Sequence, residues 1–259
     1  MFDALRQAGF DIMVRNHAEA ILSVDFPNET KELTEALLRV SIPAQELIAS
    51  GGGEAKSTQR LRRELDQAGW RKHHFRIQTT LDGIPLGDGT SHEIDHIRRA
   101  PAGTLALEIE WNNKDPFFDR DLENFQRLHA QGIISAGIIV TRGSDLQATM
   151  TARIEDFLRR SGIEDEAPLT ALGMKDRTAR QRDFVARAMA SGADFAAAFA
   201  RFFVSDKFGP ATTHWAKLAD RIHRGVGNPC PLLLIGLPST AISGDPLPET
   251  PSVPSLFDE

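Results

Sequence analysis

Two glutamates stand one residue apart in the segment LALEIEWNNKDPFF, residues 105 to 118. Successive side chains of an extended strand point to opposite faces, so Glu108 and Glu110 share one face, with Cα atoms roughly 6.6 Å apart. The opposite face is apolar and consists of Leu105, Leu107, Ile109 and Trp111. Two carboxylates at this spacing repel each other unless water, a proton or a cation relieves them. The segment therefore predicts a core strand that carries a charged site on one face.

A third acid, Asp95, lies in the preceding candidate strand, within the sequence HEIDHI. If the turn RRAPAG joins the two strands as an antiparallel hairpin, Asp95 lies beside Glu108 and Glu110. Three convergent carboxylates form an all-oxygen site of the kind that Mg²⁺ prefers, with positions left for water and a substrate phosphate. The alternative is that both glutamates belong to the exposed face of a half-solvated strand.

The elements around these acids follow the order strand, strand, strand, helix, strand over residues 73 to 141. Alternating apolar residues predict strands in HHFRIQTTLDG, SHEIDHIRRA and TLALEIEWNN, with a turn at the Asp-Gly pair of the first. The run IISAGIIVTRG is apolar and β-branched, as expected for a strand that is covered on both faces. The glutamate-bearing strand is therefore expected to be central in its sheet.

The helix between the third and fourth strands is marked at both ends. Asp115 is suited to the N-cap, Pro116 to the first helical position, and Gly132 to the position just beyond the last turn. Helical spacing predicts that its buried stripe consists of Phe118, Leu122 and Phe125.

Length and composition limit the possible classes of protein. The chain has 259 residues, of which 41% are hydrophobic, enough for one large domain or two small ones. A single cysteine, Cys230, excludes internal disulfides and multi-cysteine zinc sites and fits a reducing compartment. The first 25 residues mix charged and apolar side chains, and no apolar run of 18 residues occurs. We therefore expect a cytoplasmic protein without a membrane segment.

A basic stretch at residues 56 to 76, KSTQRLRRELDQAGWRKHHFR, contrasts with the net charge of -6. A helix is expected over about 58 to 68, within this stretch. Such a run is either the solvated face of a helix or, beside a site that acts on phosphate, a contact surface for a nucleic-acid backbone.

The spacing of Asp95, twelve residues, then Glu108-x-Glu110, in this order of elements, resembles the PD-(D/E)xK nuclease superfamily. Ile94 stands where the superfamily motif has proline. Glu110 stands where most members have lysine, a replacement also found in the BamHI and BglII group of restriction endonucleases. Four stretches between residues 50 and 237 are more specifically similar to the BglII-type restriction endonuclease family: GGGEAKSTQRLRRELDQAGW, SHEIDHI, EIEWNNKDPFFDRDLENFQRLH and GVGNPCPLLLIG.

The resemblance implies an α/β, restriction-endonuclease-like core in which helices flank a central mixed β-sheet, with added helical segments. We expect residues 1–238 to form a single nuclease domain. Its catalytic core is expected at about 73–141 and a helical accessory region at about 145–205. Residues 239–259 are rich in Pro and Ser and are expected to form a disordered or loosely attached tail.

The activity implied is Mg²⁺-dependent, sequence-specific cleavage of double-stranded DNA by a type II restriction enzyme, with Mn²⁺ able to substitute for Mg²⁺. Asp95 is expected to be the bridging metal ligand and Glu108 the second ligand. By resemblance, Glu110 orients or deprotonates the attacking water. A palindromic site favours a homodimer, and a DNA methyltransferase encoded nearby is an expected partner.

A carboxylate site repels a polyanion unless cations lie between them. We therefore expect the basic stretch to contact the DNA backbone. The candidates for DNA contact are Lys56, Arg60, Arg62, Arg63, Arg71, Lys72, Asn112, Asn113, Lys114 and Arg142. Two alternatives stay open at this stage. One is a structure-specific or modification-dependent nuclease of the same superfamily, in repair or defence. The other is a non-cleaving DNA-binding protein with a degenerate site.

Overall fold

The computed structural model describes residues 1–49, 54–78, 80–86 and 90–244. Its helices are α1 (Asp3–Gln7), α2 (Ala18–Val24), α3 (Pro27–Leu38), α4 (Ala44–Ile48), α5 (Lys56–Gln67), α6 (Phe117–Ala130), α7 (Ser144–Arg160), α8 (Ala167–Ala171), α9 (Ala179–Ala190), α10 (Phe195–Lys207), α11 (Trp215–His223) and the 3-10 turn η1 (Ser239–Ala241). Its strands are β1 (Asp11–Arg15), β2 (Ile42–Pro43), β3 (Arg71–Ile77), β4 (Thr80–Leu81), β5 (Ile84–Pro85), β6 (Thr90–Ala100), β7 (Gly103–Glu110), β8 (Ala136–Arg142), β9 (Leu232–Leu237) and β10 (Ile242–Ser243).

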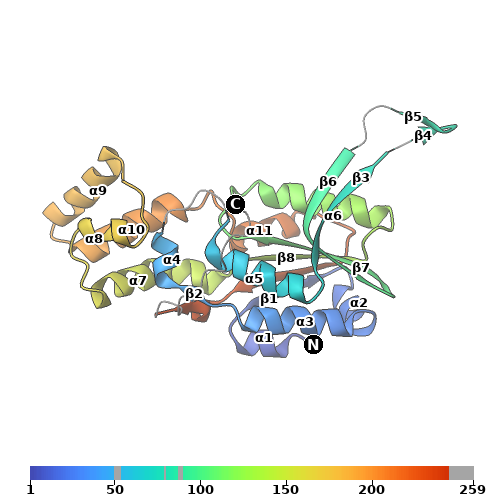
Figure 1. The fold of residues 1–259 in the computed structure, drawn as a ribbon, viewed down its shortest axis with the longest axis horizontal. Coiled ribbons are helices and arrows are strands. Elements are labelled where there is room, and N and C mark those ends of the chain that lie inside the picture. Colours follow the sequence, from blue (N-terminus) through green and yellow to red (C-terminus); the bar gives the residue numbers. More distant parts are fainter. Residues whose placement is uncertain (50–53, 79, 87–89, 245–259) are drawn as a thin grey trace, which may run out of the picture.

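A mixed sheet with the strand order β1-β9-β8-β7-β6-β3 forms the centre of the molecule (Figure 1). Strand β7 pairs antiparallel with β6 on one side and parallel with β8 on the other. The hairpin that joins β6 to β7 is the predicted one, with Ala100 opposite Gly103. The glutamate-bearing strand is therefore central, as the sequence predicted.

Helices cover both faces of this sheet. The face that carries Leu105, Leu107 and Ile109 packs in one apolar core with residues from α1 to α5, α7 and α10. The face that carries Ala106 packs in a second core with α6 and α11. This is the expected α/β arrangement of a central mixed sheet flanked by helices, and it fixes which helix lies against which side of β7.

Helix α6 keeps its predicted buried stripe, because Phe118, Leu122 and Phe125 are all fully buried. Gly132, just beyond the helix, has φ +68°, the left-handed conformation that glycine adopts readily. The prediction of Asp115 as N-cap is wrong. Pro116 occupies the cap position, without a side-chain capping bond. The Asp115 carboxylate pairs instead with Lys217 of α11 at 3.3 Å.

The region at about 145–205 is helical as predicted, and its helices α7 to α10 gather at one end of the molecule (Figure 1). The predicted start of the tail at Ser239 is wrong. Ser239 and Ala241 are buried, and Ile242 pairs in parallel with Ile42 of β2. The rest of the predicted tail, residues 245–259, lies outside the described residues.

Strand β1, which the sequence analysis did not predict, adds an antiparallel edge beside β9. In the described ranges, no helix is long and apolar enough to cross a membrane.

Close packing between the sheet and α6 gives a first prediction. A methyl group on Gly137 of β8 would overlap the ring of Phe125. Gly137→Ala is expected to lower the free energy of unfolding by about 1–3 kcal/mol or more, because overpacked cores are strained. Denaturant unfolding measures this cost. Phe125→Leu in the same chain should recover part of it, whereas equal stability of Gly137→Ala and wild type would contradict the packing described.

Candidate active site

Burial of the two glutamates decides between the two interpretations of their strand. Glu108 and Glu110 each expose only 3% of their surface, on the face of β7 that α6 covers. The alternative in which they form the exposed face of a half-solvated strand is therefore wrong. Carboxylates are rarely buried without a compensating partner.

Asp95 lies at an irregularity of β6. Between β3 and β6 the register passes from Arg71 opposite Ile97 to His73 opposite Ile94, so β6 has one extra residue here. Such a bulge locally interrupts pairing and redirects side chains. The pairing of β6 with β7 runs from Ala100 opposite Gly103 to His96 opposite Leu107, so Asp95 comes just beyond the last pair.

Asp95 and Glu108 are in contact at this point. The backbone N–H of Asp95 donates to Glu108 Oε2 at 3.4 Å. Burial raises the pKa of Glu108 well above its usual value, and the negative charges of Asp121 and Asp95 and a carboxyl hydrogen bond with Asp95 raise it further. A proton or a cation is therefore needed between these acids, as the sequence analysis argued.

Glu110 has different neighbours. Asn113 Nδ2 donates to its Oε2 at 2.7 Å, and the Arg120 guanidinium lies 3.6 Å from its Oε1. Burial and the negative charge of Asp121 raise its pKa to about 8. Glu110 is thus held on the α6 side by Asn113, which the sequence analysis named as a candidate for DNA contact, and by Arg120, to which it gave no role.

Asp121 of α6 is a residue that the sequence analysis missed. It is fully buried, and its Oδ2 has no hydrogen-bond partner within the described part of the chain. A signal was available, because Asp121 stands three residues after Phe118 and four before Phe125, within the apolar stripe of the helix. An acid in such a stripe marks either a buried ion pair or a site.

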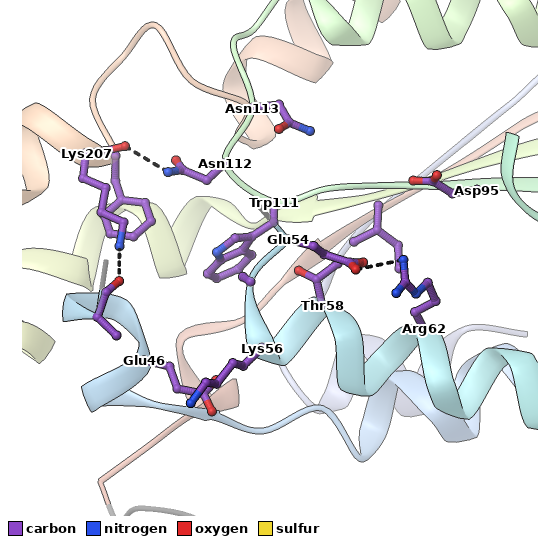
Figure 2. Close-up of a pocket in the computed structure, with 14 residues that line it drawn as sticks. Glu46, Glu54, Lys56, Thr58, Arg62, Asp95, Trp111, Asn112, Asn113 and Lys207 are labelled. Atoms are coloured by element: carbon purple, nitrogen blue, oxygen red, sulfur yellow. Dashed lines mark hydrogen bonds and ion pairs between the residues drawn. The ribbon is translucent and has the colours of Figure 1, made fainter. Parts of the chain in front are cut away.

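A cavity of about 640 Å³ opens on the other side of β7 (Figure 2). Asp95 of β6, Ile109 of β7 and Trp111 just beyond β7 line this cavity, together with residues of α4, of α5 and of the C-terminal end of α10. Asp95 therefore lies between the buried glutamates and an open cavity, where a substrate can reach it.

Glu54 is a second acid that the sequence analysis missed. It lines the same cavity as Asp95 and pairs with Arg62 at 2.9 Å (Figure 2). Burial raises the pKa of Glu54, Arg62 opposes this, and the negative charge of Asp95 adds to it. In the sequence, Glu54 is marked only by its place between a glycine run and a basic helix, and this is a weak signal.

The acids do not form a closed metal cage. Within the described ranges, no three His, Cys, Asp or Glu side chains lie close enough together to hold a metal ion. Asp95 and Glu108 are brought together, while Glu110 lies with Asp121. The donor set suits a hard divalent cation even so, because Mg²⁺ is commonly held by one or two carboxylates together with water and substrate phosphate.

The predicted basic residues differ in how free they are. Lys56 and Arg63 are exposed, and Lys56 also lines the cavity. Arg60 is held inward, since its guanidinium forms a two-pronged pair with Glu46 at 2.7 and 2.9 Å. Surface ion pairs join the others: Arg62 with Glu54, Arg71 with Asp66 and Lys72 with Glu93.

The polar residues that follow β7 serve mainly to connect segments. Asn112 Nδ2 donates to the carbonyl of Lys207 at 3.1 Å, and Lys114 forms a backbone bridge with Thr212. Both Asn112 and Asn113 line the cavity, but Lys114 does not.

Arg142 is fully buried, and burial lowers its pKa to about 9. Its guanidinium donates to the carbonyl of Thr213 at 2.7 and 3.1 Å and to the hydroxyl of Thr212 at 2.6 Å. Through these bonds Arg142 braces the loop before α11.

The family model described as "Restriction endonuclease BglII/BglIII" matches residues 10–237. The chain belongs to this family. It is accordingly a sequence-specific DNA endonuclease, a type II site-specific deoxyribonuclease that acts as a hydrolase, with a restriction-endonuclease-like fold. A comparison with curated proteins finds no match. The resemblance inferred from Asp95, Glu108 and Glu110 and from the four longer stretches is confirmed at the level of the family.

The raised pKa of Glu110 gives a second prediction. A group whose pKa is raised on folding from 4.5 to about 8 stabilises the fold fully below pH 4.5, and this contribution is lost as the pH rises through 8. In EDTA, Glu110→Gln should therefore be more stable than wild type at pH 8 and above, by a few kcal/mol, since one pKa unit is worth about 1.4 kcal/mol. Thermal unfolding against pH measures this.

The exposed Glu164 provides the control, because Glu164→Gln should leave the pH dependence unchanged. Superimposable stability curves for Glu110→Gln and wild type across this range would contradict the burial described.

Proposed function

We propose that this restriction endonuclease cuts double-stranded DNA in a Mg²⁺-dependent reaction, with Asp95 and Glu108 as the metal ligands, and that Mn²⁺ can replace Mg²⁺. The observation that supports this most directly is the contact between Asp95 and the buried Glu108 carboxyl beside an open cavity. The negative charge of Asp95 raises the pKa of Glu108, so ionisation of both carboxyls is unfavourable unless a cation lies between them. A bound Mg²⁺ would supply that charge and polarise the phosphodiester.

Glu110 has a supporting role in this proposal. In the hydrolysis, water attacks phosphorus, the bond to the 3′ oxygen breaks, and that oxygen takes up a proton. Glu110 is fixed by Asn113, whose Nδ2 donates to its Oε2 at 2.7 Å. A carboxyl held in one direction in this way favours orientation of the water by Glu110 over its deprotonation.

The basic stretch of α5 and β3 supplies the surface for the DNA backbone in this account. Lys56 and Arg62 line the cavity together with Asp95, and the exposed Arg63 lies next to Arg62 on α5. The hydrogen bond that Lys72 donates to Glu93 is the main cause that raises the pKa of Lys72, and the nearby Asp95 carboxylate adds to this rise. These cations offset the repulsion between phosphates and the acidic site.

We further propose a palindromic recognition site that is cut by a homodimer, with a cognate DNA methyltransferase that protects the host. A twofold DNA site presents the same surface twice, and a symmetric dimer brings one active site to each strand. The alternative is a recognition site that is cut only when it is modified. Cleavage of methylated against unmethylated plasmid separates the two.

The direct test is digestion of a defined plasmid with Mg²⁺, followed by sequencing of the ends. Wild type should give discrete fragments with one recurring end sequence. Asp95→Asn and Glu108→Gln should each reduce cleavage by on the order of 10²-fold or more, because several kcal/mol of charge stabilisation is lost.

Exposed Glu164 again provides the matched control, since Glu164→Gln should cut like wild type. A smear, no cutting by wild type, or full cutting by Glu108→Gln would contradict the proposed role of these acids.

Two neighbouring arginines of α5 give a further prediction about DNA binding. The slope of log affinity against log salt is negative. Arg63→Gln should reduce its magnitude by about 0.9, the amount for one phosphate contact. Arg60→Gln should leave this slope unchanged but lower the free energy of unfolding by about 1.5–3 kcal/mol, because it removes charged hydrogen bonds to Glu46. Fluorescence anisotropy against salt, with thermal unfolding alongside, distinguishes the two, and the reverse pattern would refute the assignment.

A further inference from the structure

Arg120, in the first turns of α6, reaches the acids from the side opposite to the basic stretch. Its Nε donates to Asp121 Oδ1 at 2.8 Å, and its Nη2 lies 2.7 Å from the same oxygen. The same Nη2 is 3.6 Å from Glu110 Oε1. Among the described residues, every ion pair to Glu110 or Asp121 comes from Arg120.

The Arg120 side chain is much more exposed to solvent than the two acids with which it pairs. Asp121 is fully buried and Glu110 is 96% buried at its side chain, but the Arg120 side chain is 54% exposed. The guanidinium therefore lies where the buried acids meet solvent. No hydrogen bond runs from its Nη1 to another residue that the structure describes, so part of its donor fork is unused.

Two contacts fix the guanidinium in place. Asp121 holds one edge of the fork, and the guanidinium carbon lies 4.4 Å from the centre of the Phe117 ring. Burial opposes the charged form, but the charges of Asp121, Glu110 and Glu108 raise the pKa of Arg120 overall. A cation that is charged and already ordered loses little entropy when it binds an anion.

A DNA phosphate that approaches Asp95 and Glu108 meets several carboxylates. On the cavity side, Lys56 and Arg62 offset this charge. On the α6 side, Arg120 is the cation that pairs with the acids. Guanidinium groups bind phosphate oxygens through charged N–H donors, and Nη1 of Arg120 makes no hydrogen bond to another described residue, so it can make such a contact.

We propose that Arg120 contacts a backbone phosphate of the bound DNA strand, at or next to the bond that is cut, and that Asp121 is the positioning residue that orients it. The proposal rests on the proposed function for its location of the cut bond. It involves a charged hydrogen bond and no proton transfer. Arg120 then supplies a positive charge beside Glu110.

The test combines DNA binding without cleavage and single-turnover cleavage. Binding of fluorescein-labelled duplex DNA is measured in EDTA at several salt concentrations. Arg120→Gln should reduce the magnitude of the negative slope of log affinity against log salt by about 0.9, and Arg120→Lys should keep the slope of wild type. With Mg²⁺ at saturating enzyme, Arg120→Gln should cut on the order of 10²-fold more slowly, with partial recovery in Arg120→Lys.

Arg127 is a matched control on the same helix, 50% exposed and paired with Glu123 four residues away. Arg127→Gln should leave the cleavage rate and the salt slope unchanged. Asp121→Asn should keep the slope, because Arg120 remains, but should slow cleavage, because the fork is no longer held.

An unchanged salt slope in Arg120→Gln overturns the proposal, whatever its effect on thermal stability. If Arg120→Gln reduces the magnitude of the slope but wild type cuts no DNA, the phosphate contact is supported and the proposed Mg²⁺-dependent cleavage is refuted. The two proposals therefore fail in distinguishable ways.

Discussion

The burial of several carboxyl groups around one central strand is the constraint on which the rest of the site depends. Glu108, Glu110 and Asp121 are almost or fully removed from solvent, and Asp95 lies at their edge. Charges of one sign in such an environment are unfavourable unless protons or cations balance them. The raised pKa values of Glu108 and Glu110 are one expression of this cost. A bound divalent cation and the half-exposed Arg120 would relieve it by other means.

The sheet also divides the site into two sides with different chemistry. Asp95 faces the cavity, where Glu54 and the basic stretch lie, and the bulge in β6 gives it that orientation beside Glu108. Glu110 stays on the α6 side with Arg120. The sequence resemblance predicts that Glu110 stands where most members of the superfamily carry lysine. Arg120 lies beside Glu110 and brings a positive charge to it from a different element.

Much of the fold follows from local patterns in the sequence. The alternation in β7, the apolar run of β8 and the stripe of α6 each depend on one periodicity, and all three were predicted. The end of the chain was harder. Ser239 and Ile242 lie in a segment rich in small and polar residues. Ser239 nevertheless bonds to Asp145 and Arg153 of α7, and Ile242 pairs with Ile42 of β2, through contacts from far along the sequence that no local pattern shows. The prediction of the N-cap of α6 failed for a similar reason, because the Asp115 carboxylate pairs with Lys217 of α11.

The site could be predicted only where strand alternation and a motif spacing coincide. Glu108 and Glu110 satisfied both conditions, and Asp95 needed the hairpin as well. Asp121 interrupts an otherwise apolar stripe and was detectable in principle. Glu54 and Arg120 were not, because each looks like an ordinary charged residue until the tertiary structure brings it to the acids.

The central claim is that Asp95 and Glu108 bind a divalent cation, and that Glu108, whose pKa burial raises, gives up a proton when the cation binds. Calorimetric titration of Mn²⁺ into the DNA-free protein at pH 7, in buffers of different ionisation enthalpy, measures the protons released on binding. The account predicts net proton release in wild type and weaker binding with less release in Glu108→Gln. Binding without proton release, or equal binding and release in Glu108→Gln, would contradict it.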